Sequence, residues 1–341
     1  MAETASPQSA TRAENREPVV GVIYNPRSHR NKGQDLDIAA RPNVHVEQPE
    51  THQDIGAALD GLARKNIDFL IINGGDGTVR DVLTRGQEVF GANWPELAVL
   101  PKGKTNALNV DLGAPNGWTL PEAIEAYKNG NRIARRPISV VRLGKGAGGP
   151  QLEPGSGPAA EPMLGFILGG GAFTLGIQAG QDAHKLGAFN SLAVAATGVW
   201  GVAQALFGTD QNIWRRGTAI RFLLGPEREE LQHGGRGDRG RRAIFLCSTL
   251  ERFPAGLKIF GAGYAGLKLT VLDRPHRRVL AALPLVLAGA VPQWVKDRGF
   301  HQVQTDSFEL HSEGEYILDG EAYPAGHFRV TQGPELSFVI P

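Results

Sequence analysis

A run of apolar residues that leads straight into a glycine-rich turn constrains the fold of this chain more than any other feature. The four residues Phe69–Ile72 have the composition of a strand covered on both faces of a sheet. Three glycines follow closely: Gly74, Gly75 and Gly77. Because glycine lacks a Cβ and tolerates positive φ, such a turn lets a bulky anion approach the backbone N–H groups. The turn therefore predicts a phosphate-binding loop.

The same turn carries one carboxylate and one hydroxyl, Asp76 and Thr78. The following segment, Val79–Arg85, is expected to begin a helix whose N-terminal amides and dipole favour phosphate. Asp76 is suited to a phosphate-bound Mg²⁺ and Thr78 to a phosphate oxygen. The alternative is an ordinary strand-to-helix turn with a surface aspartate. Three glycines around one Asp after such a strand favour the nucleotide interpretation.

The first half of the chain alternates strands with helices, which predicts an α/β unit with a parallel sheet and helices on both faces. Besides Phe69–Ile72, the expected strands are Val19–Tyr24, Val44–Glu47 and Leu97–Leu100. The other expected helices are Asp54–Lys65 and Pro121–Asn129.

Near Arg136 the pattern changes to short strands between turn-rich connections, which is typical of an antiparallel β-sandwich. The expected strands are Ile138–Leu143, Met163–Leu168, Thr218–Leu224, Ala243–Ser248, Leu267–Leu272 and Phe308–Leu310. Residues 144–162 and 225–242 are expected loops.

The sequence thus predicts a polar, disordered leader (1–17), an α/β nucleotide-binding domain (18–136) and a β-sandwich domain (137–341) whose C-terminal segment returns toward the cleft. A formal net charge of +1 gives no general attraction to nucleic acid. The lone Cys247 excludes an internal disulfide, suits a reducing cytosol, and is expected to be a small buried apolar residue.

No apolar run reaches the roughly 20 residues that span a bilayer, and no secretory signal is visible. The closest run, Leu192–Phe207, is expected to form a buried helix, so any membrane attachment would be peripheral. Basic clusters such as His276–Arg278 and Arg239–Arg242 could contact anionic headgroups, although a solvated loop face is the simpler interpretation.

Asn73–Thr78 resembles the nucleotide loop of the diacylglycerol kinase catalytic-domain family, which includes bacterial lipid kinases and sphingosine kinases; NAD kinases share this loop. Asn25–Ser28 (Asn25, Pro26, Arg27, Ser28) matches the family's Asn-Pro-x-Ser opening, which the resemblance implies contacts nucleotide phosphates. Thr51 stands where the family has a nucleotide-contacting threonine. Its alternative role is to cap the following helix.

Pro101–Asn106 follows an expected strand, so it lies on the carboxyl edge of the sheet, where ligands gather. Pro101, Gly103 and Asn106 match the family's Pro-x-Gly-Thr-x-Asn pattern. Lys104 replaces the usual Thr, with Thr105 one place later, so the lysine could supply a charge in place of the hydroxyl. A P-loop is rejected because Ala98 occupies the position of its first glycine.

The segment Tyr316–Glu321 is a short apolar strand that ends in two carboxylates separated by Gly320. On its own it is a strand and turn with solvated acids. It matches the family's Asp-Gly-Glu motif, which implies that Glu321 takes the proton from the substrate hydroxyl and that Asp319 assists it or helps order the metal.

Besides Lys104, the chain departs from the family at three places. Arg80 replaces a common Asn after the glycine loop, and Leu168–Phe173 lacks the Asn of the segment that opens the acceptor side. Ala265 stands where an Asp helps hold a structural Mg²⁺, so that second metal is expected to be absent.

The resemblance implies an ATP- and Mg²⁺-dependent phosphotransferase of lipid metabolism and phospholipid biosynthesis. It would pass the γ-phosphate to the hydroxyl of diacylglycerol or a related lipid alcohol. It would be cytoplasmic, peripheral to the inner face of the membrane, without a nucleic-acid partner, and possibly a homodimer. The acceptor lipid, the preferred nucleotide and the oligomeric state stay open.

Two alternatives remain at this point. A NAD kinase-like enzyme shares the glycine loop, but this chain has no Asn-Glu pair of the kind that family uses for the dinucleotide. The second alternative is a non-catalytic protein of the same fold that binds a nucleotide or a lipid. Retention of Asp76 together with Asp319 and Glu321 argues against it, because a binding module needs no base.

Overall fold

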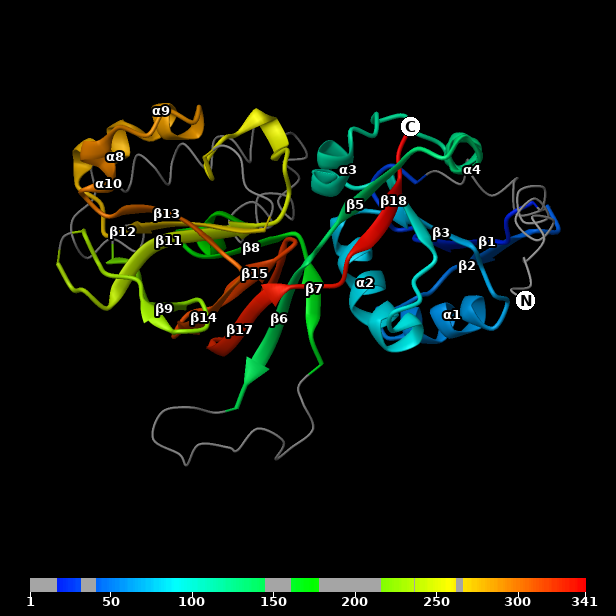
Figure 1. Ribbon diagram of the computed structural model, residues 1–341, viewed down its shortest axis with the longest axis horizontal. Helices are drawn as coiled ribbons and strands as arrows, with labels where there is room; N and C mark the ends of the chain where they lie inside the picture. Colours follow the sequence, from blue (N-terminus) through cyan, green and yellow to red (C-terminus); the bar gives the residue numbers. More distant parts are fainter. Residues whose placement is uncertain (1–16, 32–40, 145–160, 178–215, 236, 262–265) are drawn as a thin grey trace, which may run out of the picture.

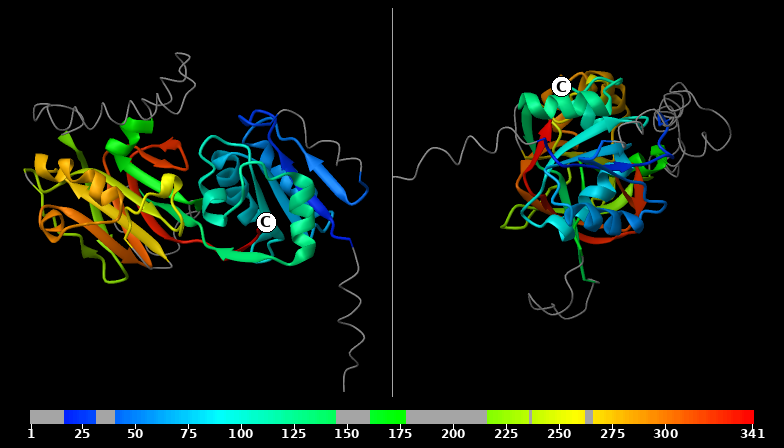
Figure 2. Two further views of the ribbon diagram at one scale, coloured as in Figure 1. Left: turned by 90° about the horizontal axis from the view of Figure 1, so that it is seen from above. Right: turned by 90° about the vertical axis from the view of Figure 1, so that its right-hand side faces the viewer.

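The computed structural model describes residues 17–31, 41–144, 161–177, 216–235, 237–261 and 266–341. Two units lie side by side, an α/β unit and an antiparallel β-sandwich (Figures 1 and 2). The fold class predicted from the sequence is confirmed.

The first unit is built on a six-stranded sheet with the order β2-β1-β3-β4-β18-β5. All neighbouring strands pair in parallel except β18 and β5. Its strands are β1 (Val20–Tyr24), β2 (Val44–Glu47), β3 (Phe69–Gly74), β4 (Glu96–Pro101), β5 (Arg132–Arg135) and β18 (Leu336–Val339). β3 lies between β1 and β4, which explains why its side chains are apolar on both faces.

Helices cover both faces of this sheet: α1 (Asp54–Ala63), α2 (Asp76–Phe90), α3 (Ala107–Leu112) and α4 (Leu120–Asn129). Leu70 and Ile72 of β3 join the core formed with α1, α2 and α3. Phe69 and Ile71 point to the opposite core, which α4 completes. Side chains of β3 thus alternate between the two cores, so the helices on both faces of the sheet pack against this one strand.

The second unit is an antiparallel sandwich of 12 strands within the described residues. One layer holds β6 (Ile138–Leu143), β7 (Met163–Gly165), β9 (Thr218–Leu224), β10 (Glu229–Glu230), β14 (Ser307–Ser312) and β17 (Gly326–Gln332). The other holds β8 (Ile167–Gly171), β11 (Arg241–Ser248), β12 (Leu267–Asp273), β13 (Phe300–Thr305), β15 (Tyr316–Leu318) and β16 (Glu321–Tyr323). The layers join where β11 pairs briefly with β9. Apolar side chains of both layers form one core.

The chain passes between the units more than once. The predicted boundary near Arg136 falls between β5 and β6. The last strand, β18, returns to the first sheet, where Phe338 and Val339 enter the two cores. This strand therefore belongs with the first sheet, not with the second domain in which the sequence placed it. A C-terminal strand carries no local signal of the sheet that it joins.

Further elements differ from the sequence prediction; β5, β10, β13, β17 and three short helices within residues 277–296 were not predicted, and β10 lies within the predicted 225–242 loop. α2 begins at Asp76, three residues before Val79, because the extended Gly75 serves as its N-cap. The short helix α3 was not predicted. The expected strand from Met163 is interrupted at Phe166, which divides it into β7 and β8. Several predictions concern residues outside the described ranges. These are residues 1–16 of the predicted leader, the Leu192–Phe207 helix, most of the 144–162 loop, and Ala265.

Three short helices lie on the outer side of the sandwich: α8 (Arg277–Ala281), α9 (Leu283–Leu287) and α10 (Gln293–Lys296) (Figure 1). Among the described residues, no helix has both the length and the apolar composition needed to cross a bilayer. Cys247 is buried in the sandwich core as predicted, and burial raises the pKa of its thiol.

Candidate active site

Glycines are required in this loop because it packs closely against its neighbours, and not because its backbone adopts positive φ. Glycine would permit positive φ at Gly74, Gly75 and Gly77, but none of the three adopts it. A Cβ on Gly74 would lie 2.5 Å from the side chain of Thr78, and one on Gly75 would lie 3.0 Å from the Cα of Gly103. A Cβ on Gly77 would meet nothing within 4 Å. Two of the glycines therefore let the turn close on its neighbours, and the third leaves open space at the start of α2.

Asp76 ties this loop to the loop that follows β4. Its carboxylate accepts the backbone N–H of Asn106 at 3.0 Å and that of Ala107 at 2.8 Å. These are the first N–H donors of α3, which have no partner within that helix. Asp76, a residue of α2, therefore supplies the acceptors for them. Burial raises the pKa of Asp76, and the two N–H groups oppose that shift.

Asn106 closes its own loop. Its backbone is left-handed with φ of 51°, its Oδ1 accepts the Gly103 N–H at 2.7 Å, and its Nδ2 donates to the Gly103 carbonyl at 3.1 Å. The neighbouring Lys104 and Thr105 are exposed. The structure therefore assigns Asn106 to loop geometry and leaves Lys104 and Thr105 on the surface of the loop.

The opening loop after β1 is attached to the glycine loop through side chains. Asn25 Nδ2 donates to Thr78 Oγ1 at 2.8 Å, and Asn25 Oδ1 accepts the N–H of Arg27 at 3.0 Å. Pro26 and Arg27 are exposed, and Ser28 is partly buried. All three predicted phosphate loops thus meet at one edge of the sheet.

Thr51 lies apart from these contacts. Its hydroxyl is exposed and donates to Asp54 Oδ2 at 2.7 Å, and it also accepts the N–H of Asp54 at 3.4 Å. These bonds hold Thr51 against the first residue of α1, whose N-cap position is Gln53.

The Asp-Gly-Glu segment forms a tight hairpin between β15 and β16. Asp319 and Gly320 have φ values of 45° and 84°, and Leu318 pairs with Glu321 across the turn. Asp-Gly with positive φ at both positions is the composition that two-residue hairpin turns prefer. The turn fixes both carboxylates at one end of the sandwich.

Asp319 is partly buried beside the first unit. Its carboxylate accepts the N–H groups of Phe166 at 3.0 Å and Ile167 at 2.9 Å, which closes the corner between β7 and β8. Burial and, after it, the charge of Asp76 raise the pKa of Asp319 to about 7. The hairpin also contacts the helix that follows the glycine loop, because Arg80 of α2 donates to the Leu318 carbonyl.

Glu321 is joined to the first unit by an ion pair. Its Oε2 accepts from Arg80 Nη2 at 2.6 Å, while half of its side chain is exposed. Arg80 is buried on α2, and it also bonds Asp81 at 2.6 Å and the Leu318 carbonyl at 3.4 Å. Arg80 was noted in the sequence only as a departure. Its role as the contact between the units could not be found there, because its partners are far away in the chain.

Further polar groups extend this contact. Asp81 accepts a hydrogen bond from the exposed His52, and the guanidinium of Arg80 lies 5.9 Å from the centre of the Tyr323 ring. A cavity of about 230 Å³ opens here, and it is lined by His52, Arg80, Tyr323 and Met163 among others. The site thus combines the hairpin with a partly apolar hollow.

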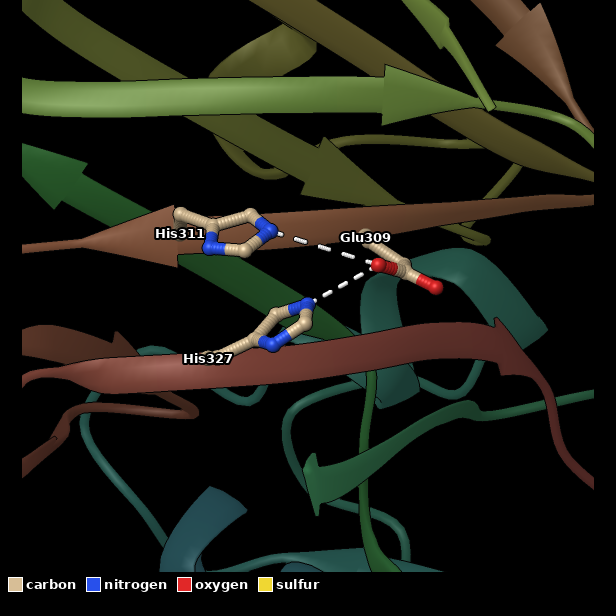
Figure 3. A group of neighbouring side chains, drawn as sticks. All are labelled: Glu309, His311 and His327. Atoms are coloured by element: carbon tan, nitrogen blue, oxygen red, sulfur yellow. Dashed lines mark hydrogen bonds and ion pairs between the residues drawn. The ribbon is translucent and has the colours of Figure 1, made fainter. Parts of the chain in front are cut away.

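A second group of polar side chains lies on the sandwich, away from this site: Glu309, His311 and His327 (Figure 3). The Glu309 carboxylate lies 2.9 Å from His327 Nε2, and it also pairs with Arg228 at 2.8 Å and Arg329 at 3.5 Å. Because two arginines already balance this carboxylate, we interpret the group as an ion-pair network of the sheet face.

Residues 19–142 match the model of the diacylglycerol kinase catalytic domain. This part of the chain is therefore similar to the catalytic domain of diacylglycerol kinases, and the resemblance noted in the sequence is confirmed. A search of curated proteins found no match.

Solved structures extend the likeness to the whole fold. A diacylglycerol kinase from Bacillus anthracis str. Sterne has 15% sequence identity and a TM-score of 0.59, with 94% of this chain and 96% of that chain covered. A structure described as a putative diacylglycerol kinase from the same organism gives 15% identity and a TM-score of 0.58, covering 94% and 97%. At this identity the comparison shows the two-domain fold alone.

Proposed function

We propose that this protein is an ATP-dependent lipid kinase that transfers the γ-phosphate to the hydroxyl of diacylglycerol or a related lipid alcohol. The observation that carries the proposal is the meeting of the two motifs. The glycine loop with Asp76 and the hairpin with Asp319 and Glu321 come from opposite ends of the chain, and Arg80 joins them directly.

The nucleotide would lie over the three loops at the carboxyl edge of the first sheet. The N-terminus of α2 supplies backbone N–H groups, and the open space at Gly77 lets phosphate approach them. Thr78 already accepts from Asn25, so its own hydroxyl proton is available for a phosphate oxygen. Lys104 and Thr105, both exposed on their loop, would add a charge and a hydroxyl.

A divalent cation fits this site. Asp76 and Asp319 are two carboxylates whose charges oppose each other, and burial raises the pKa of both. A cation between or beside them would offset that repulsion. Asp76 would hold Mg²⁺, with Asp319 helping to order it. When bound, the ion would neutralise the phosphate charge during transfer.

A general base needs to be accessible to the acceptor and to have a suitable pKa, and each carboxylate of the hairpin has one of these two properties. Glu321 is accessible, and Arg80 fixes its position by binding one oxygen of the carboxylate. Asp319 has a pKa near neutrality, but its oxygens already accept two backbone N–H groups. We assign proton removal from the acceptor hydroxyl to Glu321 and a positioning role to Asp319.

The test is transfer of labelled γ-phosphate from ATP to a panel of lipid alcohols in mixed micelles with Mg²⁺. Diacylglycerol or a close relative should become labelled by the wild-type protein and not by Asp76→Asn. Labelling of NAD in place of lipid would instead establish the NAD kinase alternative. ATP binding without transfer to any acceptor in the panel would favour the non-catalytic alternative.

A further inference from the structure

The exposed large apolar side chains of this protein are concentrated on the short helices of the sandwich. Within the described residues there are four of them: Leu285 at 52%, Val110 at 40%, and Leu287 and Trp294 at 38% each. Three of these belong to α9 and α10. Figure 1 shows α8–α10 on the sandwich, whereas α3, which carries Val110, belongs to the α/β unit.

The sequence of this region has an unusual charge pattern. Residues 279–295 contain no charged residue, and basic residues stand at both ends of the stretch: Arg277, Arg278, Lys296 and Arg298. Asp297 is the one acidic residue between 277 and 298. Apolar side chains flanked by cations are the pattern of a segment that rests on an anionic lipid surface.

The segment is a folded platform with one buried face. Val279, Leu280, Val286 and Val295 enter a core with Leu272 and Phe300 of the sheet below. Leu285 and Leu287 flank the buried Val286, so one residue of α9 enters the core while its two neighbours face solvent. The exposed side chains are therefore held outward by the fold, and they would enter a membrane without the segment having to unfold.

Trp294 adds an interfacial anchor. The guanidinium of Arg298 lies 5.7 Å from the centre of its ring, and Arg298 Nη1 donates to the Trp294 carbonyl at 3.0 Å. A tryptophan beside an arginine presents an apolar body and a cation at the same depth, which suits the headgroup region of a bilayer.

We propose that residues 277–298 form the surface by which this protein docks on anionic membranes. Leu285, Leu287 and Trp294 would enter the headgroup–acyl boundary, and Arg277 and Arg278 would contact anionic headgroups. The proposal deepens the lipid kinase function proposed above and rests on it for its biological purpose, but its chemistry can be tested separately.

The test is co-sedimentation of the protein with vesicles of phosphatidylcholine alone and of phosphatidylcholine mixed with phosphatidylglycerol. Binding should require the anionic lipid and weaken with added salt. The double variant Arg277→Glu/Arg278→Glu should lower the partition coefficient by on the order of 25-fold or more. Arg239→Glu/Arg41→Glu makes the same charge change at other exposed sites and should have a much smaller effect.

Leu285→Gln/Trp294→Ala should lower binding about tenfold or more while the thermal unfolding midpoint stays close to that of the wild type, because both side chains are exposed. Val110→Gln is the matched apolar control. Equal binding by wild type and both double variants would overturn the proposal. So would a wild-type dimer that Leu285→Gln/Trp294→Ala converts to monomer, because the surface would then be an interface between two copies.

Activity on a water-soluble short-chain diacylglycerol separates this proposal from the function. If the surface variants lose activity on vesicles but keep it on the soluble acceptor, both stand. Vesicle binding that depends on this surface, without phosphorylation of either acceptor, would support the surface and contradict the kinase. Turnover of both acceptors by the surface variants at wild-type rates would keep the kinase and contradict the surface.

Discussion

The nucleotide side and the acceptor side of this site are held together in different ways. On the nucleotide side, the loops interlock through the backbone: Gly75 lies against Gly103, and Asp76 holds the N–H groups that begin α3. On the acceptor side, the hairpin meets the first unit through charged side chains, chiefly Arg80 with Glu321. Backbone interlocking gives a rigid cradle, whereas a half-exposed ion pair can be rearranged when a substrate arrives.

This difference accounts for the retained glycine loop and for the change at Arg80. A loop that fits by backbone contact tolerates few residue types, so its glycines and Asp76 match the family. An ion pair between side chains can be built from other residues, so Arg80 can replace the usual Asn.

The largest expected effect is loss of the Asp76 charge. Asp76→Asn should lower kcat/KM by on the order of a hundredfold to a thousandfold, because the site loses the carboxylate proposed to hold the cation. The amide oxygen can still accept one of the two N–H groups, so the free energy of unfolding should change by about 1 kcal/mol. Steady-state kinetics with a denaturation curve on the same sample would check both values.

The backbone contact is tested by a pair of glycine variants. Gly103→Ala places a Cβ 2.7 Å from the Cα of Gly75, where neither backbone can move freely, so unfolding should become easier by about 1–3 kcal/mol. Gly77→Ala meets nothing within 4 Å. It should leave stability unchanged or raise it by up to about 1 kcal/mol, since alanine is the better helix residue.

The same pair distinguishes folding from binding. If the space at Gly77 is used by phosphate, Gly77→Ala should weaken ATP binding in isothermal titration while the protein stays folded. A destabilised Gly77→Ala, or an unaffected Gly103→Ala, would contradict the assignment of these glycines.

The acceptor side should depend on Arg80 more than on Glu321 for stability. Arg80→Ala leaves Asp81 and Glu321 without their buried cation, and it should cost about 2–4 kcal/mol in urea denaturation. Glu321→Gln should cost less than about 1 kcal/mol, because half of its side chain is in water. A double-mutant cycle with a large coupling between the two would show that the contact is more rigid than we infer.

Asp319 predicts a specific pH dependence of stability. Its pKa is raised from 3.8 to about 7 by folding, so the native state binds a proton that the unfolded state releases between these values. The free energy of unfolding should therefore fall as pH rises from about 4 to about 7, by on the order of 2–4 kcal/mol if the shift is fully expressed. Asp319→Asn should flatten that part of the profile, and the same slope in both proteins would contradict the buried-carboxylate account.

The sequence predicted the sheets well where one local pattern decides the outcome. The apolar run Phe69–Ile72 indicates a strand buried on both faces, and the carboxyl ends of β3 and β4 then bring the loops together. It failed where distant partners decide. Neither the return of β18 to the first sheet nor the pairing of Arg80 with Glu321 leaves a local signal, because each depends on segments more than 200 residues apart.

The glycines show a related limit. The sequence indicated two reasons for these glycines, backbone freedom and the missing Cβ, and the structure uses the second, in the contacts of Gly74 with Thr78 and of Gly75 with Gly103. The roles of Asn106 and Thr51 were likewise open in sequence, since a side chain that closes its own loop resembles one that faces a ligand.

The most direct test of the central claim compares ATP affinity with the rate of phosphoryl transfer in Glu321→Gln. If the two sides divide binding and acceptor activation, the Kd for ATP with Mg²⁺ should stay within about twofold of wild type. The single-turnover rate of transfer to diacylglycerol should fall by on the order of a hundredfold or more. A transfer rate equal to that of wild type would contradict the role of Glu321, and an equal loss of ATP affinity would contradict the division itself.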